Sequence, residues 1–193
     1  IEKADVIALG CGLDRNEETI QACGLLLKKY YHKTIIIDAD AIFCLVKYGL
    51  DNLNLENCVF TPHLGEFSLL TNVNASELQK NLLYFGSEFT KRTKSFLVLK
   101  GAPTVVFLPN GKVFINSSGN NGMAKFGMGD VLTGVISSFI AQSNNIENSI
   151  LSAVYLHSLS ADLLAEEKTE YGFTAKEVAE NLPKSIKFLR GMV

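Results

Sequence analysis

The chain lacks the features that mark nucleic-acid-binding, membrane-spanning and metal-binding proteins. Its formal net charge is −2, and basic and acidic residues are mixed along it, which excludes the basic stripe of an electrostatic nucleic-acid binder. No apolar run approaches the length of a membrane-spanning helix. The cysteines are Cys11, Cys23, Cys44 and Cys58. They form no Cys-x-x-Cys pair, so we expect no metal ligands among them. We expect their thiols to be reduced, as in a cytoplasmic protein.

An initiator methionine and a signal-peptide pattern are also missing, because the sequence opens at Ile1 and becomes apolar within five residues. We therefore expect a piece of a longer polypeptide. Repeats, low-complexity tracts and obvious linkers are absent. A length of 193 residues with 47% hydrophobic residues suits one domain with a sizeable core and is short for two. We expect residues 1–193 to form a single domain.

Apolar, strand-like segments alternate with segments of helical spacing. Continuous apolar strands between helices predict an α/β domain with a mostly parallel sheet and helices on both faces. Asn110-Gly111 is a strong turn signal between the last two strands. The expected strands are Val6–Gly10, Thr34–Asp38, Asn57–Thr61, Ser95–Lys100, Thr104–Leu108 and Lys112–Ile115. The expected helices are Glu17–Tyr31, Ala41–Lys47, Leu64–Leu70, Ser76–Lys91, Asp130–Gln142, Ile146–Glu166 and Ala175–Leu189.

A glycine-rich run from Gly119 to Gly129 leads directly into an apolar helix. The backbone N–H groups of Gly127-Met128-Gly129 are expected to point to one place at the positive end of the helix dipole. Such a place suits a phosphate or a developing oxyanion. Asp130 follows at the start of the helix, where it can be an ordinary cap or can take a proton from a hydroxyl that attacks phosphorus.

Glycine-rich or polar segments follow four of the expected strands. Ligands of open parallel sheets bind beyond the carboxyl ends of the strands, so we expect these segments to converge. The segments are Gly10-Cys11-Gly12-Leu13-Asp14, Asp38-Ala39-Asp40, Thr61-Pro62-His63-Leu64-Gly65-Glu66 and Lys100-Gly101-Ala102-Pro103-Thr104.

Each candidate residue also has a purely structural interpretation. The aspartates of Asp38-Ala39-Asp40 can be turn and cap residues instead of ligands. Pro62-His63 can begin a helix, with proline at its first position, instead of contacting substrate. Lys100 can be a solvated strand end instead of lying opposite a phosphate. His157, with apolar neighbours in a long helix, is expected to be packed instead of catalytic.

Taken together, these segments resemble those of the ADP/ATP-dependent NAD(P)H-hydrate dehydratases, repair enzymes with a ribokinase-like fold. The resemblance covers essentially the whole chain, and the combination of Thr61-Pro62-His63 with Gly127-x-Gly129-Asp130 is specific. It extends to Gly119-Asn120-x-Gly122-Met123-Ala124 and to Leu132-x-Gly134. It implies a ribokinase-like three-layer sandwich from which an N-terminal strand–helix–strand portion is missing.

The resemblance implies a lyase that phosphorylates the ring hydroxyl of NAD(P)H hydrate (NADHX or NADPHX) with ADP or ATP and then eliminates phosphate to give NADH or NADPH. It makes Asp130 the general base and a substrate contact, with Gly12 and His63 also on the hydrate side. ADP is favoured as the donor, and Mg²⁺ is implied as a cofactor. A cytoplasmic homo-tetramer is implied as well. The implied nucleotide contacts are Lys100, Gly101, Ala102, Pro103, Thr104, Gly127, Met128 and Gly129.

The glycine-rich run departs from the family pattern at two positions. Lys125 and Phe126 stand where members usually carry a small polar residue and a glycine. Because phenylalanine cannot take the left-handed conformation of glycine without strain, we expect the loop to bend differently or to fit a changed nucleotide. Lys125 can either contact phosphate or be solvated. Cys11 replaces a usual proline and Asp14 a usual glycine, and neither change removes a group that the reaction needs.

Two other functions are compatible with the sequence. A ribokinase-like kinase for a small hydroxylated molecule, such as a vitamin precursor, would keep Asp130 and the glycine-rich run but has less need of Thr61-Pro62-His63. A catalytically silent nucleotide-binding domain would bind nucleotide without turnover. A stable phosphorylated product would favour the kinase over the dehydratase.

Overall fold

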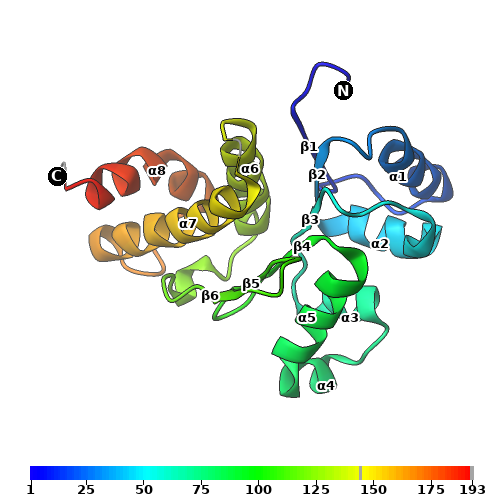
Figure 1. Ribbon diagram of the computed structural model, residues 1–193. Helices are drawn as coiled ribbons and strands as arrows, with labels where there is room; N and C mark the ends of the chain where they lie inside the picture. Colours follow the sequence, from blue (N-terminus) through cyan, green and yellow to red (C-terminus); the bar gives the residue numbers. More distant parts are fainter. Residues whose placement is uncertain (144, 192–193) are drawn as a thin grey trace. The chain divides into compact units, whose positions relative to one another are not determined.

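The computed structural model describes residues 1–143 and 145–191, and it divides into two compact units. The first unit runs from Ile1 to Ile115 and contains a six-stranded sheet with its helices (Figure 1). The second unit, from Asn116 onward, is helical. Among the described helices, none is both long and apolar enough to cross a membrane.

The strands of the first unit lie in the sheet in the order in which they follow one another along the chain. The first four strands are parallel to their neighbours, and the last two are joined antiparallel as a hairpin. Gly111 makes the expected turn with φ +86°. The α/β class with a mostly parallel sheet is confirmed. The strands are β1 Val6–Leu9, β2 Thr34–Ile37, β3 Cys58–Phe60, β4 Phe96–Leu99, β5 Val105–Phe107 and β6 Val113–Ile115.

The helices of the first unit pack on one face of this sheet. Side chains alternate between the faces of a strand, and the residues that share a core with the helices are alternate ones, such as Ile35 with Ile37 and Leu97 with Leu99. Helices on the other face stay a prediction. The helices of this unit are α1 Glu17–Lys29, α2 Ala39–Tyr48, α3 Leu64–Thr71, α4 Ala75–Lys80 and α5 Leu82–Thr93, with a short 3-10 helix, η1 Leu50–Asn52.

The single helix predicted over Ser76–Lys91 is wrong, because the structure has two helices there. Asn81 leaves helical geometry at φ −132° and ψ 37°, and its N–H is donated to the carbonyl oxygens of Glu77 and Leu78. Asparagine competes for backbone hydrogen bonds and therefore favours helix ends over helix interiors. The two helices nevertheless share one core, in which Leu78 and Phe89 are buried.

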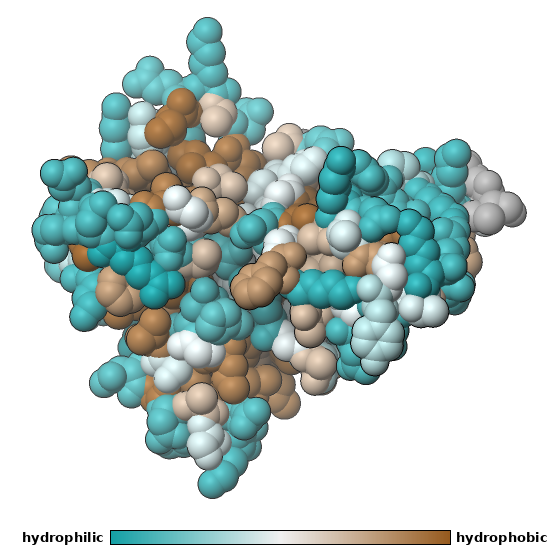
Figure 2. Space-filling model, turned by 180° about the vertical axis from the view of Figure 1, so that it is seen from behind, coloured by the Kyte–Doolittle hydropathy of each residue, from teal (hydrophilic) through white to brown (hydrophobic). Residues whose placement is uncertain are grey.

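The described residues of the second unit form three α-helices and a 3-10 turn. They are η2 Asn121–Met123, α6 Met128–Ala141, α7 Ile146–Lys168 and α8 Ala175–Leu189. A small core joins the first residue of α6, Met128, with Leu164 of α7 and Val178 of α8. Hydrophilic side chains prevail around α8, which lies at the right of Figure 2. Helix α6 begins two residues earlier than predicted, because Gly127 caps it in the left-handed conformation.

Candidate functional site

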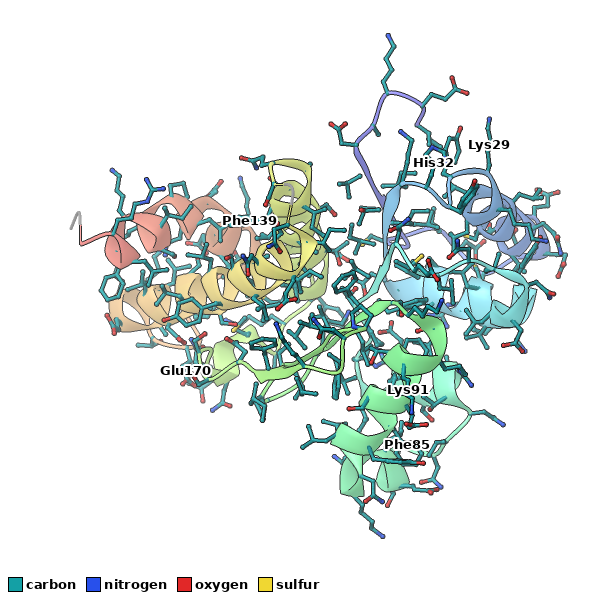
Figure 3. All side chains as sticks on the ribbon, in the orientation of Figure 1. Lys29, His32, Phe85, Lys91, Phe139 and Glu170 are labelled. Carbon is teal, nitrogen blue, oxygen red and sulfur yellow. The ribbon has the colours of Figure 1, made fainter. Side chains whose placement is uncertain are left out.

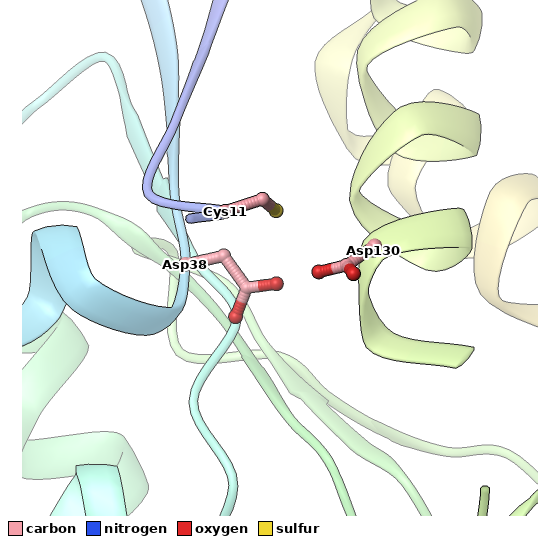
Figure 4. Close-up of side chains that lie close together, drawn as sticks. All are labelled: Cys11, Asp38 and Asp130. Atoms are coloured by element: carbon pink, nitrogen blue, oxygen red, sulfur yellow. The ribbon is translucent and has the colours of Figure 1, made fainter. Parts of the chain in front are cut away.

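The expected convergence of segments is confirmed within the first unit, at the carboxyl ends of β1 to β4. Gly10 lies so close to the next strand that a Cβ there would stand 1.7 Å from the carbonyl oxygen of Asp38. Its φ of +137° also excludes other residues. Gly12 has φ +69° but open space around it, so its conformation and not crowding favours glycine. Cys11 and Asp38 follow β1 and β2 directly (Figure 4).

Asp38 and Lys100 form a shielded ion pair in this region. The Lys100 Nζ donates to Asp38 Oδ1 at 2.7 Å, and Asp38 is only 1% exposed. Asp38 also caps α2 by accepting the N–H of Ala39 at 2.9 Å. The Lys100 side chain is 21% exposed, so its interpretation as a solvated strand end is wrong. The cap interpretation of Asp38 is right but incomplete, because the same carboxylate also holds a lysine.

His63 caps α3 with its side chain. Its Nδ1 accepts the N–H groups of Gly65 at 3.0 Å and of Glu66 at 3.2 Å, and the Glu66 side chain accepts the N–H of His63 at 2.8 Å. This is a capping box in which histidine takes the place of the usual hydroxyl residue. Helix α3 begins at Leu64, as expected, so the alternative with Pro62 as the first helical residue is wrong, although His63 does have the structural role of its cap. Most of the His63 ring remains exposed, with 61% of the side chain accessible.

Asp40 holds the loop that follows β1. It accepts the Arg15 Nε–H at 2.6 Å and the Asp14 N–H at 3.2 Å. Asp14 itself adopts φ +70°, in the left-handed region that its usual counterpart glycine favours. These contacts support the interpretation of Asp40 as a structural residue.

The segment after β4 is open to solvent. Gly101, Ala102 and Pro103 are exposed, and the Thr104 hydroxyl donates to the Gly101 carbonyl oxygen at 3.2 Å. The parallel pairing of Lys100 with His63, through the Lys100 N–H and the Pro62 carbonyl oxygen at 2.8 Å, places this segment beside the end of β3. The predicted nucleotide-side and hydrate-side segments of the first unit are thus neighbours.

The second unit carries the segment Gly119–Gly129, here called the anion loop. Gly127 turns it with φ +86°, so Met128, Gly129 and Asp130 form the first turn of α6. The N–H groups of a first helical turn have no acceptor within the helix, and they carry the positive end of its dipole. The left-handed turn and the helix start that such a site needs are present, but the Met128 N–H is donated to the Lys125 carbonyl oxygen at 3.4 Å, and anion binding stays a prediction.

Asp130 is exposed and is not the helix cap. The cap of α6 is Gly127, and no side chain caps this helix. The Asp130 carboxylate projects from the first turn of α6 (Figure 4), where a carboxylate is stabilised by the dipole. The interpretation of Asp130 as a mere cap is therefore wrong.

Contacts that the sequence did not reveal hold the anion loop in place. Asp162 of α7 accepts the N–H of Gly119 at 2.8 Å and the side-chain amide of Asn120 at 2.9 Å. Gly122 lies so close to the chain after α7 that a Cβ would stand 2.3 Å from the Glu170 carbonyl oxygen. Asp162 is the one carboxylate between Glu147 and Glu166 in the sequence, and no other signal marked it.

Lys125 ties the anion loop to the connection between α7 and α8. Its Nζ donates to the carbonyl oxygens of Glu170 at 3.0 Å and Phe173 at 2.8 Å, and lies 4.4 Å from the centre of the Phe173 ring. Glu170 is labelled on this connection in Figure 3. Lys125 is therefore not merely solvated. Phe126 is fully exposed and has no left-handed φ, because the left-handed turn falls on Gly127 instead.

Replacing Lys125 by methionine is expected to lower the free energy of unfolding by about 1.5–3 kcal/mol, the range for hydrogen bonds that involve a charged group. Methionine keeps the apolar stem over Phe173 and removes the donor to both carbonyl oxygens. Urea unfolding measures the change. Lys176→Met is the matched control, because that side chain is 83% exposed and should cost little. Equal effects of the two substitutions would contradict the proposed tie.

His157 is packed, as the sequence predicts, and it contacts the start of α6. It is 4% exposed, hydrogen-bonds to the backbone of Met128, and leaves its Nε2 without a partner among the described residues. Burial lowers the pKa of His157 from its ordinary 6.5 to about 4, although the bond to Met128 opposes this shift. A neutral histidine therefore supports the first turn of α6 at neutral pH.

The lowered pKa of His157 predicts a loss of stability in mild acid. Between pH 6.5 and 4 the unfolded chain binds a proton that the folded protein does not, so stability falls as the pH falls through this window. We expect about 2 kcal/mol of this loss between pH 7 and pH 5. Urea unfolding across this range should show a shallower pH dependence for His157→Gln, while the exposed His32→Gln should follow the wild type. The same pH dependence of stability in the wild type, His157→Gln and His32→Gln would contradict the assignment of this loss to His157.

Comparisons with known proteins identify the family of the chain, while the roles of the site residues stay predictions. Residues 1–184 match the family model of the NAD(P)H-hydrate dehydratases. The bifunctional NAD(P)H-hydrate repair enzyme Nnr of Thermofilum pendens is 35% identical over 191 residues, which are 98% of this chain and 36% of that enzyme. The chain thus spans about a third of the length of this relative.

Solved structures give the same result for the fold. The ADP/ATP-dependent NAD(P)H-hydrate dehydratase from Bacillus subtilis, co-crystallized with ATP/Mg²⁺ and soaked with CoA, matches with a TM-score of 0.83 and 31% identity over 97% of this chain and 68% of its own. A ribokinase-like superfamily protein from Enterococcus faecalis matches with a TM-score of 0.84 and 34% identity, over 97% of this chain and 64% of its own. The ribokinase-like class is confirmed. With a family match that extends over residues 1–184, this chain belongs to the NAD(P)H-hydrate dehydratase family.

Proposed function

We propose that this chain catalyses the ADP- or ATP-dependent dehydration of NAD(P)H hydrate to NAD(P)H. The observation that carries the proposal is the exposed carboxylate of Asp130, which follows the anion loop in the first turn of α6 and is not used as a cap. Membership of the family supports the reaction type, and the similar Bacillus subtilis enzyme is named for this reaction.

The chemistry follows from the poor leaving ability of hydroxide. Asp130 takes the proton of the ring hydroxyl as the hydroxyl oxygen attacks the terminal phosphorus of the nucleotide. The bond from this phosphorus to the bridging oxygen breaks, and AMP leaves when ADP is the donor, or ADP when ATP is the donor. The backbone N–H groups of Met128 and Gly129, with the left-handed turn at Gly127, hold the transferred phosphoryl group. Phosphate then leaves with the electron pair of the carbon–oxygen bond, and loss of the neighbouring ring proton forms the double bond of NAD(P)H.

The first unit supplies the remaining proposed contacts. The exposed segment Gly101–Thr104 lines the nucleotide, and Gly12 and His63 line the hydrate. Lys100 contributes chiefly by neutralising Asp38 beside this segment, since its Nζ already lies 2.7 Å from that carboxylate. We propose that the two units work as one domain on these shared substrates.

Mg²⁺ is the proposed cofactor, and it fits the donor chemistry of the site. This ion keeps several waters and binds through substrate phosphates with one or two carboxylates, so few protein ligands are needed. We name no residue of this chain as an Mg²⁺ ligand, because Asp130 is needed as the base, and the nucleotide phosphates and water can supply the donors. When bound, Mg²⁺ offsets the negative charge of the phosphates.

We further propose a cytoplasmic location and assembly as a homo-tetramer. The cysteines support the location, because no disulfide links any of the four, all of which lie in the described part of the chain. Burial raises the pKa of Cys23 and of Cys58 to about 12, so these two stay protonated and unreactive. The tetramer follows from family resemblance, and sedimentation of the purified chain tests it.

Regeneration of NADH from chemically prepared hydrate tests the proposed function. The near-ultraviolet absorbance of NADH is followed in parallel samples with ADP, with ATP and without nucleotide, all with Mg²⁺. The proposal predicts recovery with a nucleotide only, and faster recovery with ADP. Nucleotide consumption that yields a stable phosphorylated product without NADH would instead indicate a small-molecule kinase. Nucleotide binding without turnover would indicate a silent domain.

A further inference from the structure

The side chain of Glu66 faces two residues at the ends of different strands. Its Oε2 accepts the His63 N–H at 2.8 Å and lies 3.9 Å from Lys100 Nζ, while its Oε1 lies 3.5 Å from His63 Nε2. The Glu66 side chain is 12% exposed, so these contacts are largely shielded from water. One carboxylate therefore connects the turn after β3 with the end of β4.

The hydrogen bonds of His63 define which of its nitrogens carries a proton. Nδ1 accepts two backbone N–H groups, from Gly65 and Glu66, so it cannot itself carry a hydrogen. The neutral ring must then carry its hydrogen on Nε2, on the side that faces Glu66 Oε1. His63 accordingly offers a hydrogen-bond donor to a ligand and not a base.

The turn leaves little freedom for the His63 ring. A Cβ at Gly65 would stand 3.0 Å from the His63 Cε1, so glycine at this position lets the ring lie across the start of α3. Backbone N–H groups hold the ring at Nδ1, and the Glu66 carboxylate, 3.5 Å from Nε2, favours a hydrogen on that nitrogen by its charge while leaving the N–H to a ligand. The spacing of histidine, glycine and glutamate in this motif thus has a direct geometric reason.

We propose that Glu66 is a positioning residue, which holds His63 as an Nε2–H donor and ties the His63 turn to Lys100. The ligand atom that such a donor recognises is an acceptor oxygen, and under the proposed function it belongs to the hydrate. The identity of this ligand rests on the proposed function, whereas the positioning of His63 by Glu66 does not.

Nitrogen NMR of the histidine rings tests the positioning directly, without any substrate. At about pH 8, above the ordinary histidine pKa of ~6.5, the wild type should show His63 with the hydrogen on Nε2 alone. Glu66→Ala should move the ring nitrogens of His63 toward the averaged shifts of two tautomers, and Glu66→Gln, which keeps an acceptor for the His63 N–H, should largely preserve the wild-type spectrum. His63→Gln assigns the signals, and unchanged His32 and His157 signals show that each variant is folded.

Steady-state kinetics supply the second measurement. Glu66→Ala should raise KM for the hydrate about tenfold, which corresponds to ~1.4 kcal/mol, with a much smaller change in KM for the nucleotide. Glu77→Ala is the matched control, because Glu77 occupies the same position in the first turn of α4, where Asn74 and not histidine is the cap. We expect no change for this control.

Two results would overturn the proposal. One is a His63 spectrum that is the same in Glu66→Ala as in the wild type, and the other is a wild-type spectrum with the hydrogen on Nδ1. If the wild type fails to turn over the hydrate while the spectra change as expected, the proposed function fails and the role of Glu66 stands.

Discussion

Replacing Asp130 by asparagine is expected to lower the rate of hydrate dehydration by about 10²–10⁴, the usual contribution of a general base. Asparagine has nearly the same size and cannot accept the hydroxyl proton. The backbone of the anion loop is set by Gly127 and by contacts to α7, so the nucleotide should still bind. The turnover number from the NADH assay and the dissociation constant of ADP from calorimetry separate the two effects.

Glu147→Gln is the matched control for this substitution. Glu147 also lies in the first turn of a helix of the second unit, α7, so the change removes a similar negative charge from a helix N-terminus. We expect its rate to stay within a factor of two of the wild type, as for a charge outside the site. Unchanged turnover in Asp130→Asn would remove Asp130 from the mechanism, and equal losses in both variants would assign the effect to charge alone.

Replacing Lys100 by methionine is expected to destabilise the protein by about 3 kcal/mol, at the lower end of the cost of breaking a buried ion pair. Methionine fills a similar volume but takes away the ammonium group 2.7 Å from Asp38, whose carboxylate is 1% exposed. The lower end of this energy range applies because the Lys100 side chain is still 21% exposed to solvent. Urea unfolding of the purified variant measures the loss.

A second ion pair of the same unit provides the control. Lys94 lies 2.8 Å from Glu56, but the two side chains are 69% and 53% exposed. Lys94→Met should therefore change stability by less than about 1 kcal/mol. Adding Asp38→Asn to Lys100→Met should recover part of the larger loss, because the unbalanced charge is then gone. A loss in Lys100→Met no larger than in Lys94→Met would contradict the shielded pair.

The secondary structure was predictable because its signals are local. Continuous apolar strands, the Asn110-Gly111 turn and the glycine at position 127 each act over a few residues, and the structure has the expected strands in a mostly parallel sheet. The break at Asn81 was missed because apolar periodicity continues across it from Leu78 to Phe89. Apolar periodicity shows which side of a segment is buried, but it does not show whether the segment forms one continuous helix.

The candidate residues were predictable as members of strand ends, but their partners were not. Asp38 and Lys100 are 62 positions apart, and Lys125 meets carbonyl oxygens of Glu170 and Phe173 that belong to a distant connection. Backbone carbonyls leave no trace in the sequence, because every residue has one. For this reason Lys125 could only be expected to be solvated or to contact phosphate, whereas its contacts show a third role.

The balance between NADH formed and inorganic phosphate released tests the central claim most directly. Purified chain, hydrate, Mg²⁺ and ADP are combined, and both products are quantified in the same sample over time. Phosphorylation followed by elimination predicts one inorganic phosphate and one AMP for each NADH, with no phosphorylated ring product remaining. Accumulation of a phosphorylated product without NADH, or formation of NADH without phosphate release, would contradict the account.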